Sequence, residues 1–184
     1  ISTYGMHTLH GRALSVATGA QMANHELKII VTGGDGDGYG IGGNHFVHSM
    51  RRNVDLTYIV MNNQVYGLTT GQISPTSTKG MKTKSTPAGS VENPLNPIPL
   101  AIAAGATYVA RAYTGQVKHM VELIKGGIQH RGFSLIDAFS PCVTFNLEND
   151  HDFFKQRTFK LEDKKHDPTD FAAAMKYGYE WGDE

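Results

Sequence analysis

The motif Gly-Asp-Gly-Asp-Gly at residues 34–38 constrains the fold more than any other part of this sequence. It follows residues 27–32, a short apolar run rich in β-branched side chains, which is typical of a buried strand in a parallel sheet. Asp35 would then lie at the carboxyl end of that strand, where open α/β sheets bind their ligands. The motif therefore predicts an α/β fold with polar groups gathered at one edge of the sheet.

A second apolar run, at residues 56–61, predicts a neighbouring strand that ends just before Asn62 and Asn63. The sequence between the two runs has a helical pattern at about residues 43–52, so the three elements would form a βαβ unit. Because both strands of such a unit run in the same direction, their carboxyl ends share one edge. We therefore expect Asp35 to meet Asn63 there.

Asp35 and Asn63 offer the oxygen atoms that magnesium prefers. Magnesium needs an octahedron of oxygen ligands, and it commonly takes few of them from protein and the rest from phosphate and water. One carboxylate, one amide oxygen and one backbone carbonyl would suit it. Gly36 and Gly38 would let the backbone approach phosphate groups and direct its N–H groups toward them. The sequence thus predicts a site for magnesium and a diphosphate.

The rest of the chain continues the alternation of helix and strand. Helices are expected at residues 8–23, 99–106 and 115–129, and strands at 108–112 and 133–138. This order predicts a doubly wound α/β fold with a mostly parallel sheet.

Two long segments lack this alternation. Residues 64–97 are rich in Thr, Ser, Gly and Pro, and a loop of this length in a compact domain usually has a function. From residue 146 the chain turns polar and charged, with one last helical pattern at residues 171–181. We therefore expect a domain at residues 1–145 that carries the site, and a polar C-terminal extension at residues 146–184 that packs on the domain or on a partner subunit.

Composition sets the remaining bounds. The 184 residues carry 17 acidic and 17 basic side chains, which gives no electrostatic footprint for nucleic acid or an anionic membrane. No apolar run approaches the ~20 residues needed to span a bilayer, and a signal-peptide pattern is absent, so the cytoplasm is the expected location. The single cysteine excludes an internal disulfide framework. Because the sequence starts at Ile1 and not at methionine, we expect a fragment that lacks N-terminal residues.

Four motifs together resemble the thiamine-diphosphate-binding β subunit of the 2-oxoacid:ferredoxin oxidoreductases, and the resemblance covers nearly the whole chain. They occur in the order and spacing of that family. The motifs are His-Thr-Leu-His-Gly-Arg-Ala, Gly-Gly-Asp-Gly-Asp-Gly-Tyr-Gly-Ile-Gly-Gly-Asn-His, Tyr-Ile-Val-Met-Asn-Asn-Gln-Val-Tyr-Gly-Leu-Thr-Thr-Gly-Gln and Ser-Pro-Cys-Val-Thr-Phe-Asn. Residues 68–78 look most like family members that act on 2-oxoglutarate.

The resemblance implies a role for individual residues. Magnesium would be bound by the side chains of Asp35 and Asn63 and by the backbone carbonyl of Val65. Six further positions match cofactor-binding positions of the family: His10, Gly11, Gly36, Asp37, Gly67 and Leu68. No catalytic residue is assigned, because the carboxylate that activates thiamine in this family resembles a contribution of the companion subunit.

Cys142 matches one of four cysteine ligands of a 4Fe-4S cluster in the family. The other three cluster cysteines of the family precede the point where this sequence begins. One thiolate cannot hold a cluster, so Cys142 is expected to be a ligand only in the intact protein.

The resemblance also implies the reaction and its participants. The chain would act, together with an α subunit, in the coenzyme A-dependent oxidative decarboxylation of a 2-oxoacid, most like 2-oxoglutarate. Electrons would pass to ferredoxin. Thiamine diphosphate, magnesium and the 4Fe-4S cluster would be the cofactors.

Several alternatives stay open at this point. The glycine motif could be only a tight turn, and residues 38–43 also match a dinucleotide fingerprint, although the acidic residue expected after the second strand is replaced by Asn62 and Asn63. His7 with His10, or His45 with His48, are at helical spacing, but no third zinc ligand accompanies either pair. By composition alone, the single cysteine would be a small buried residue. The chain could also serve a different thiamine decarboxylase or synthase, or be a cofactor-binding or assembly module without activity.

Overall fold

The computed structural model describes residues 3–180 and has a four-stranded parallel sheet at its centre. The strand order is β1-β2-β6-β5, and a separate two-stranded antiparallel pair joins β3 to β4. The strands are β1 (Ile30–Gly34), β2 (Leu56–Asn62), β3 (Val65–Tyr66), β4 (Gln72–Ile73), β5 (Tyr108–Tyr113) and β6 (Phe133–Phe139). Ile1, where the sequence starts, lies outside the described residues.

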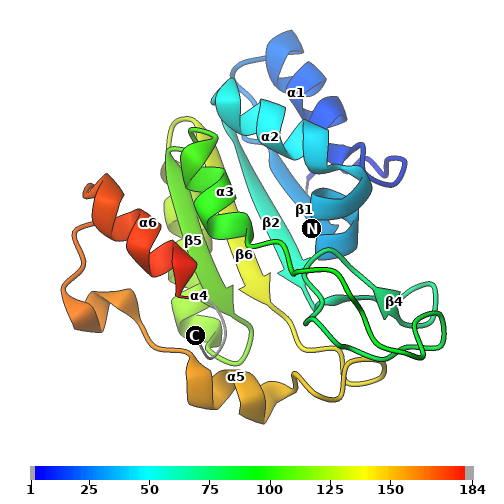
Figure 1. The fold of residues 1–184 in the computed structure, drawn as a ribbon. Coiled ribbons are helices and arrows are strands. Elements are labelled where there is room, and N and C mark those ends of the chain that lie inside the picture. The colour runs from blue at the N-terminus through cyan, green and yellow to red at the C-terminus, as the bar shows by residue number, and fades with distance from the viewer. Residues whose placement is uncertain (1–2, 181–184) are drawn as a thin grey trace.

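Helices cover both faces of the sheet, as in a doubly wound fold (Figure 1). Helices α1, α2 and α3 pack on one face, and α4 packs on the other against β2, β5 and β6. The helices are α1 (Ala13–Ala23), η1 (Gly36–Ile41), α2 (Gly43–Arg51), α3 (Pro97–Ala103), α4 (Val117–Gln129), α5 (His151–Arg157), η2 (Leu161–Lys164) and α6 (Phe171–Tyr179). The α/β fold class with a mostly parallel sheet is confirmed.

The main core lies between the sheet and helices α1 to α3. Phe46 and Met50 of α2 are fully buried against Tyr58 and Val60 of β2 and Leu135 of β6. Burying a large apolar side chain stabilises a fold by about 1.5–3 kcal/mol, so this layer fixes β2 and β6 at the centre of the sheet. The carboxyl ends of these strands are thereby held in place for the polar groups that follow them.

Several predicted bounds were wrong. The helix expected from residue 8 begins at Ala13, because Gly11 has a φ of +72°, which no right-handed helix contains. The first strand begins at Ile30 and continues through Gly33 and Gly34, which pair with β2. The motif itself is not an open loop, since residues 36–41 form one turn of π-helix.

The two segments without alternation take different shapes. Residues 64–97 contain the small β3–β4 pair and fold below the carboxyl ends of β1 and β2 (Figure 1). The last part of the chain runs past the carboxyl ends of β5 and β6 at α5 and then turns back along the sheet, so that α6 packs on α3 (Figure 1). The last predicted helix forms as α6 and ends at Tyr179, whereas residue 181 lies outside the described part. Among residues 3–180, no helix is both long enough and apolar enough to cross a membrane.

Candidate cofactor and metal site

Asp35 and Asn63 meet at the carboxyl edge of the sheet, as the βαβ interpretation predicts. Asp35 follows β1 and is only 1% exposed, and its Oδ1 accepts a hydrogen bond of 3.4 Å from the backbone N–H of Asn63. The two residues are 28 positions apart and come together because β1 and β2 are parallel neighbours. This contact uses the backbone of Asn63, and the role of the two side chains as magnesium ligands stays a prediction.

The second oxygen of Asp35 is held by two hydroxyl groups of the long loop. Ser74 Oγ and Thr76 Oγ1 both donate to Oδ2, the latter at 2.7 Å. Oδ1 accepts the long bond from Asn63, and a carboxylate oxygen has a second lone pair for a further partner. A carboxylate fixed in this way would present one oxygen to a cation, as a monodentate ligand. Sequence reasoning missed Ser74 and Thr76, although it expected the loop to have a function.

The electrostatics of Asp35 favour a cation. Burial raises the pKa of the Asp35 carboxyl group, and the hydrogen bonds from Ser74 and Thr76 lower it only in part. A buried carboxylate is costly unless it is paired or binds a metal. An ion at Oδ1 would supply the missing positive charge.

The turn that carries Asn63 and Val65 is held tightly. Asn63 Oδ1 accepts the backbone N–H of Val65 at 3.1 Å, and Gln64 between them adopts a left-handed φ of +60°. Asn146 donates to the carbonyl of Asn63 at 3.2 Å, and Asn149 donates to Gln64 Oε1 at 2.7 Å. Two asparagines of the segment after β6 thus fix the backbone that would offer the predicted carbonyl ligand.

Asp37 joins two of the predicted cofactor positions. Its Oδ1 accepts the backbone N–H of Gly11 at 2.6 Å and lies 2.9 Å from His10 Nδ1. The turn at residues 10–11 is therefore tied to the glycine motif, 26 positions away for Gly11. Because its carboxylate faces this turn, Asp37 would contact a diphosphate through its backbone and not through its negative side chain.

The glycines of the motif are also required by packing. A Cβ at Gly36 would overlap the ring of Tyr66, and a Cβ at Gly38 would overlap the hydroxyl group of Tyr58. Tyr66 Oη in addition donates to the carbonyl of Gly36 at 2.9 Å. Close packing explains these glycines without a ligand, so their approach to phosphate stays a prediction.

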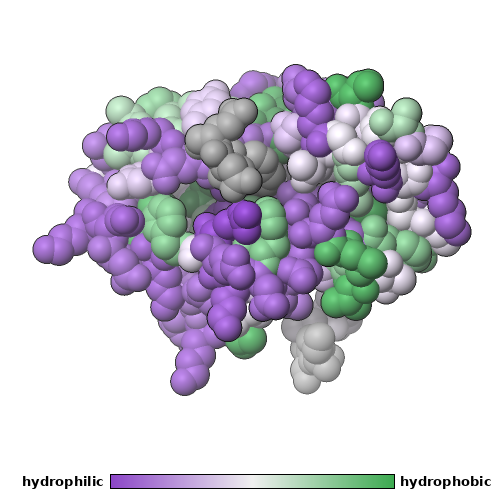
Figure 2. Space-filling model, turned by 60° about the horizontal axis from the view of Figure 1, so that its bottom comes forward, coloured by the Kyte–Doolittle hydropathy of each residue, from purple (hydrophilic) through white to green (hydrophobic). Residues whose placement is uncertain are grey.

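Gly67 and Leu68 form the turn after β3. The carbonyl of Gly67 accepts the N–H of Thr70 at 3.1 Å, and the Leu68 side chain is 99% exposed. Figure 2 views the molecule from the side to which the strand ends point, and most of that surface is hydrophilic with separate hydrophobic areas. Leu9 and Ile41 are also exposed. Exposed apolar side chains beside a polar site suit a surface that another molecule covers.

Cys142 lies beyond β6, in the segment that supports the Asn63 turn. Its Sγ accepts the N–H of Phe145 at 3.4 Å, and its carbonyl accepts the N–H of Asn146 at 3.3 Å. The side chain is partly buried. Within residues 3–180 no group of three or more His, Cys, Asp or Glu side chains is arranged so that it could hold a metal.

A second layer of buried polar groups lies behind Asp35. Thr76 Oγ1 is 2.9 Å from Asn62 Oδ1, and Asn62 Nδ2 donates to Asp137 Oδ1 at 3.1 Å. Tyr39 Oη donates to the same oxygen at 2.8 Å. Asp137 Oδ2 lies 3.6 Å from Arg111 Nε, an ion pair longer than a hydrogen bond. Sequence reasoning missed this layer. Its one signal in the sequence was Asp137, a carboxylate inside the largely apolar strand β6.

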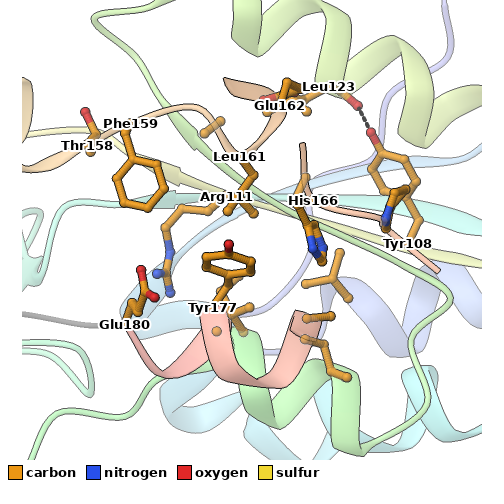
Figure 3. Close-up of a pocket in the computed structure, with 18 of the residues that line it drawn as sticks. Tyr108, Arg111, Leu123, Thr158, Phe159, Leu161, Glu162, His166, Tyr177 and Glu180 are labelled. Carbon is orange, nitrogen blue, oxygen red and sulfur yellow. Dashed lines mark hydrogen bonds between the residues drawn. The ribbon is translucent and has the colours of Figure 1, made fainter. Parts of the chain in front are cut away.

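A cavity of substantial size lies elsewhere, along β5. It has a volume of about 560 Å³ and lies between β5 and residues 157–180. Arg111, His166 and Tyr177 point into it (Figure 3), and its wall is mostly apolar. Asp35 and Asn63 do not line it. We call this side of the sheet the β5 flank, and we call the carboxyl ends of β1 and β2 with residues 64–97 the cofactor flank.

The residues on the cofactor flank fit the groups that the sequence predicted. One buried carboxylate with a free oxygen position, one amide and nearby carbonyls are the oxygen donors that magnesium takes from proteins. They do not fit a dinucleotide, since an acidic residue to bind a ribose is absent after β2.

Comparison with known proteins agrees with this geometry. Residues 1–138 match the family model of the thiamine pyrophosphate enzyme C-terminal TPP binding domain. Residues 142–184 match the family model of the C-terminal part of the pyruvate ferredoxin oxidoreductase beta subunit. The two matches together account for nearly all of the chain.

The chain is also similar to individual proteins over almost its whole length. It is 48% identical to 2-oxoacid:ferredoxin oxidoreductase 1, subunit beta, from Aeropyrum pernix, covering 99% of this chain and 60% of that protein. It is 44% identical to 2-oxoglutarate synthase subunit KorB from Archaeoglobus fulgidus, covering 93% and 66%. The chain thus spans about three fifths of the length of such relatives.

A solved structure gives the same result. The 2-oxoglutarate:ferredoxin oxidoreductase from Magnetococcus marinus, with 2-oxoglutarate, coenzyme A and succinyl-CoA bound, superposes with a TM-score of 0.94 at 48% identity. The match covers 98% of this chain and 62% of that one. This chain therefore belongs to the β subunits of the 2-oxoacid:ferredoxin oxidoreductases.

Proposed function

We propose that this chain is the part of a catalytic β subunit that binds thiamine diphosphate and magnesium in a 2-oxoacid:ferredoxin oxidoreductase. The observation that carries the proposal is the meeting of Asp35 and Asn63 at the carboxyl edge of the sheet. The matches to the thiamine pyrophosphate enzyme domain and to β subunits of this enzyme class support it.

The protein's own groups would position the cofactor. Asp35 Oδ1, Asn63 Oδ1 and the carbonyl of Val65 would hold magnesium, while His10, Gly11, Gly36 and the backbone of Asp37 would border the diphosphate. Bound thiamine diphosphate supplies a nucleophilic carbon that adds to a keto group and accepts the electrons left when carbon dioxide departs. Gly67 and Leu68 would lie beside that reaction centre.

The substrate we propose is 2-oxoglutarate, with coenzyme A as acyl acceptor and ferredoxin as electron acceptor, in the cytoplasm. Relatives named for 2-oxoglutarate and a relative bound to 2-oxoglutarate and coenzyme A support this choice. The α subunit would complete the site, because no described residue of this chain is assigned as the activating carboxylate. Cys142 would be one ligand of a 4Fe-4S cluster whose other ligands lie outside this sequence.

The test uses the β subunit assembled with its α subunit. Thiamine diphosphate is expected to raise the melting temperature only when magnesium is present. Asp35→Ala should abolish this stabilisation and reduce 2-oxoglutarate-dependent reduction of methyl viologen more than about 100-fold. The matched control is Asp55→Ala, since Asp55 accepts the N–H of Gly132 at the opposite end of the sheet.

Three outcomes would contradict the proposal. Stabilisation that survives Asp35→Ala would move the metal site elsewhere. Binding of thiamine diphosphate without any viologen reduction on 2-oxoacids would favour a non-catalytic module. Activity on 2-oxoacids without dependence on coenzyme A would favour another thiamine decarboxylase.

A further inference from the structure

Asp137 is a carboxylate in the middle of a strand, where carboxylates are rare. It lies on β6, opposite Val60 of β2 and Arg111 of β5, and its side chain is 0% exposed. Such a group is costly to bury, and hydrophobic residues would fill the same space at lower cost. A position that keeps this residue in spite of the cost calls for a reason beyond packing.

The contacts of Asp137 point toward the cofactor flank. One oxygen, Oδ1, accepts both the Tyr39 hydroxyl group at 2.8 Å and the Asn62 amide at 3.1 Å. Tyr39 belongs to η1, the turn that also contains Gly36, and Asn62 directly precedes Asn63. A single oxygen atom therefore holds the two backbone segments between which the proposed ion would lie.

A series of polar contacts also leads from Asp137 to Asp35, in which the single proton of Thr76 Oγ1 is shared between two acceptors, Asn62 Oδ1 and Asp35 Oδ2. Because Asn62 Nδ2 donates to the carboxylate, its Oδ1 must face the opposite way, toward Thr76 Oγ1 at 2.9 Å. Thr76 Oγ1 is in turn 2.7 Å from Asp35 Oδ2. The orientation of the Asn62 amide thus sets the place of the hydroxyl group that fixes Asp35.

Arg111 joins this network from the other side. Its Nε lies 3.6 Å from Asp137 Oδ2, and the same side chain lines the cavity of the β5 flank (Figure 3). Burial raises the pKa of the Asp137 carboxyl group, and the Arg111 guanidinium opposes that shift, which favours the charged form as acceptor for Tyr39 and Asn62.

We propose that Asp137 is a positioning residue that sets the affinity of the cofactor flank for the divalent cation, through Asn62 and Thr76 on one path and Tyr39 on the other. This inference rests on the proposed function, because it assumes that Asp35 binds the cation. Partners that orient metal ligands commonly change metal affinity 10- to 100-fold when they are removed.

The experiment measures the magnesium concentration for half-maximal binding of thiamine diphosphate by the assembled enzyme. Asp137→Asn keeps the size of the side chain but removes its charge, and we expect this concentration to rise about 10-fold or more. Excess magnesium should restore most of the binding. A residue with a merely structural role would lower the melting temperature and leave the magnesium midpoint unchanged.

Two further variants keep the test decisive. Ser134→Ala removes a buried hydroxyl group from the same strand, one that donates to the carbonyl of Gly127, and it should leave the midpoint unchanged. Tyr39→Phe removes only one donor to Asp137, and it should raise the midpoint by a smaller factor than Asp137→Asn. If the Asp137→Asn variant does not assemble with the α subunit, the Tyr39→Phe variant is used to test the proposal.

The outcomes separate this inference from the proposed function. If the unchanged enzyme binds thiamine diphosphate without magnesium or not at all, both proposals are overturned. If it needs magnesium, but Asp137→Asn or Tyr39→Phe has the unchanged midpoint, only the role of Asp137 is overturned.

Discussion

The two flanks of the sheet differ in what they bury. On the cofactor flank, Asp35 and Asn62 are nearly or fully buried and contact the same Thr76 hydroxyl group, and the Asn62 amide donates to Asp137 in the middle of β6. On the β5 flank, a cavity of about 560 Å³ has a mostly apolar wall. The comparison teaches that in this fold the candidate chemistry lies where polar groups converge at strand ends, and not in the apolar cavity along β5.

Charge balance explains part of the difference. On the β5 flank, His119 lies 3.1 Å from Glu162, and Arg111 pairs with Asp137, so the charged groups already have protein partners. On the cofactor flank, burial raises the pKa of Asp35, and hydroxyl groups alone face its second oxygen. A cation bound at Asp35 would therefore offset the cost of burying its carboxylate.

The largest effect should come from replacing one glycine on each flank with alanine and comparing the losses of stability. Gly36→Ala places a methyl group inside the ring of Tyr66, so Tyr66 or η1 must move, which typically costs about 1–3 kcal/mol. We expect a lower melting temperature and an almost complete loss of magnesium-dependent thiamine diphosphate binding. Gly178→Ala on α6 meets Ile98 Cγ2 at 3.2 Å, and the better helix propensity of alanine offsets that contact, so stability should change little.

A double variant shows whether the Gly36 effect has this cause. In Gly36→Ala with Tyr66→Ala, the added methyl group has room, so the combined loss of stability should be clearly smaller than the sum of the two single losses. Additive losses, measured by thermal unfolding, would show that the ring of Tyr66 is not what Gly36 avoids.

The outline of the fold was predictable because it depends on local patterns. The strands at β2, β5 and β6 and the helices α2 and α4 follow apolar periodicity, and all were expected within a few residues. The bounds that were wrong depend on contacts between distant residues. Gly11 delays the start of the first helix, for example, because its φ is +72° and its N–H bonds to Asp37.

The candidate site was predictable only in its first layer. Asp35 and Asn63 follow strands, so parallel pairing alone brings them together. Thr76 reaches Asp35 from a loop without periodicity, 41 positions away, and no local rule places it there. Asp137 could have been suspected, since a carboxylate inside an apolar strand must have a buried partner.

A medium effect is expected from the loop of the cofactor flank. Thr76→Val removes the hydroxyl group between Asp35 and Asn62 and leaves their oxygens without that donor, at a typical cost of about 1–3 kcal/mol. The magnesium midpoint should rise about 10-fold. Ser90→Ala is the control, since Ser90 is a buried hydroxyl of the same loop that bonds only to the nearby Glu92 N–H. Equal changes in both variants would mean that the loop acts only through its general stability.

The smallest effect is expected on the β5 flank, at the pair of Glu162 and His119. The backbone hydrogen bond at Glu162, followed by the bond from His119, lowers the pKa of the Glu162 carboxyl group below its ordinary value of 4.5. A carboxyl group with a lowered folded-state pKa contributes stability above its ordinary pKa, and this contribution is lost as the pH falls through the lowered value. Glu162→Gln should therefore destabilise the protein at neutral pH and have no effect in strong acid.

The expected size is a few tenths of a kcal/mol, because the Glu162 side chain is 62% exposed and solvent screens the pair. Chemical unfolding at several pH values measures the difference between the variant and the unchanged protein. Glu122→Gln is the matched control, since Glu122 pairs with Lys125 on the surface of α4 and joins no two elements. If both variants show the same pH dependence of stability, the contact of Glu162 in η2 with His119 in α4 does not help to hold η2 against the β5 flank. If only Glu162→Gln shows it, the chain itself closes this flank, in contrast to the cofactor flank with its exposed Leu9, Ile41 and Leu68.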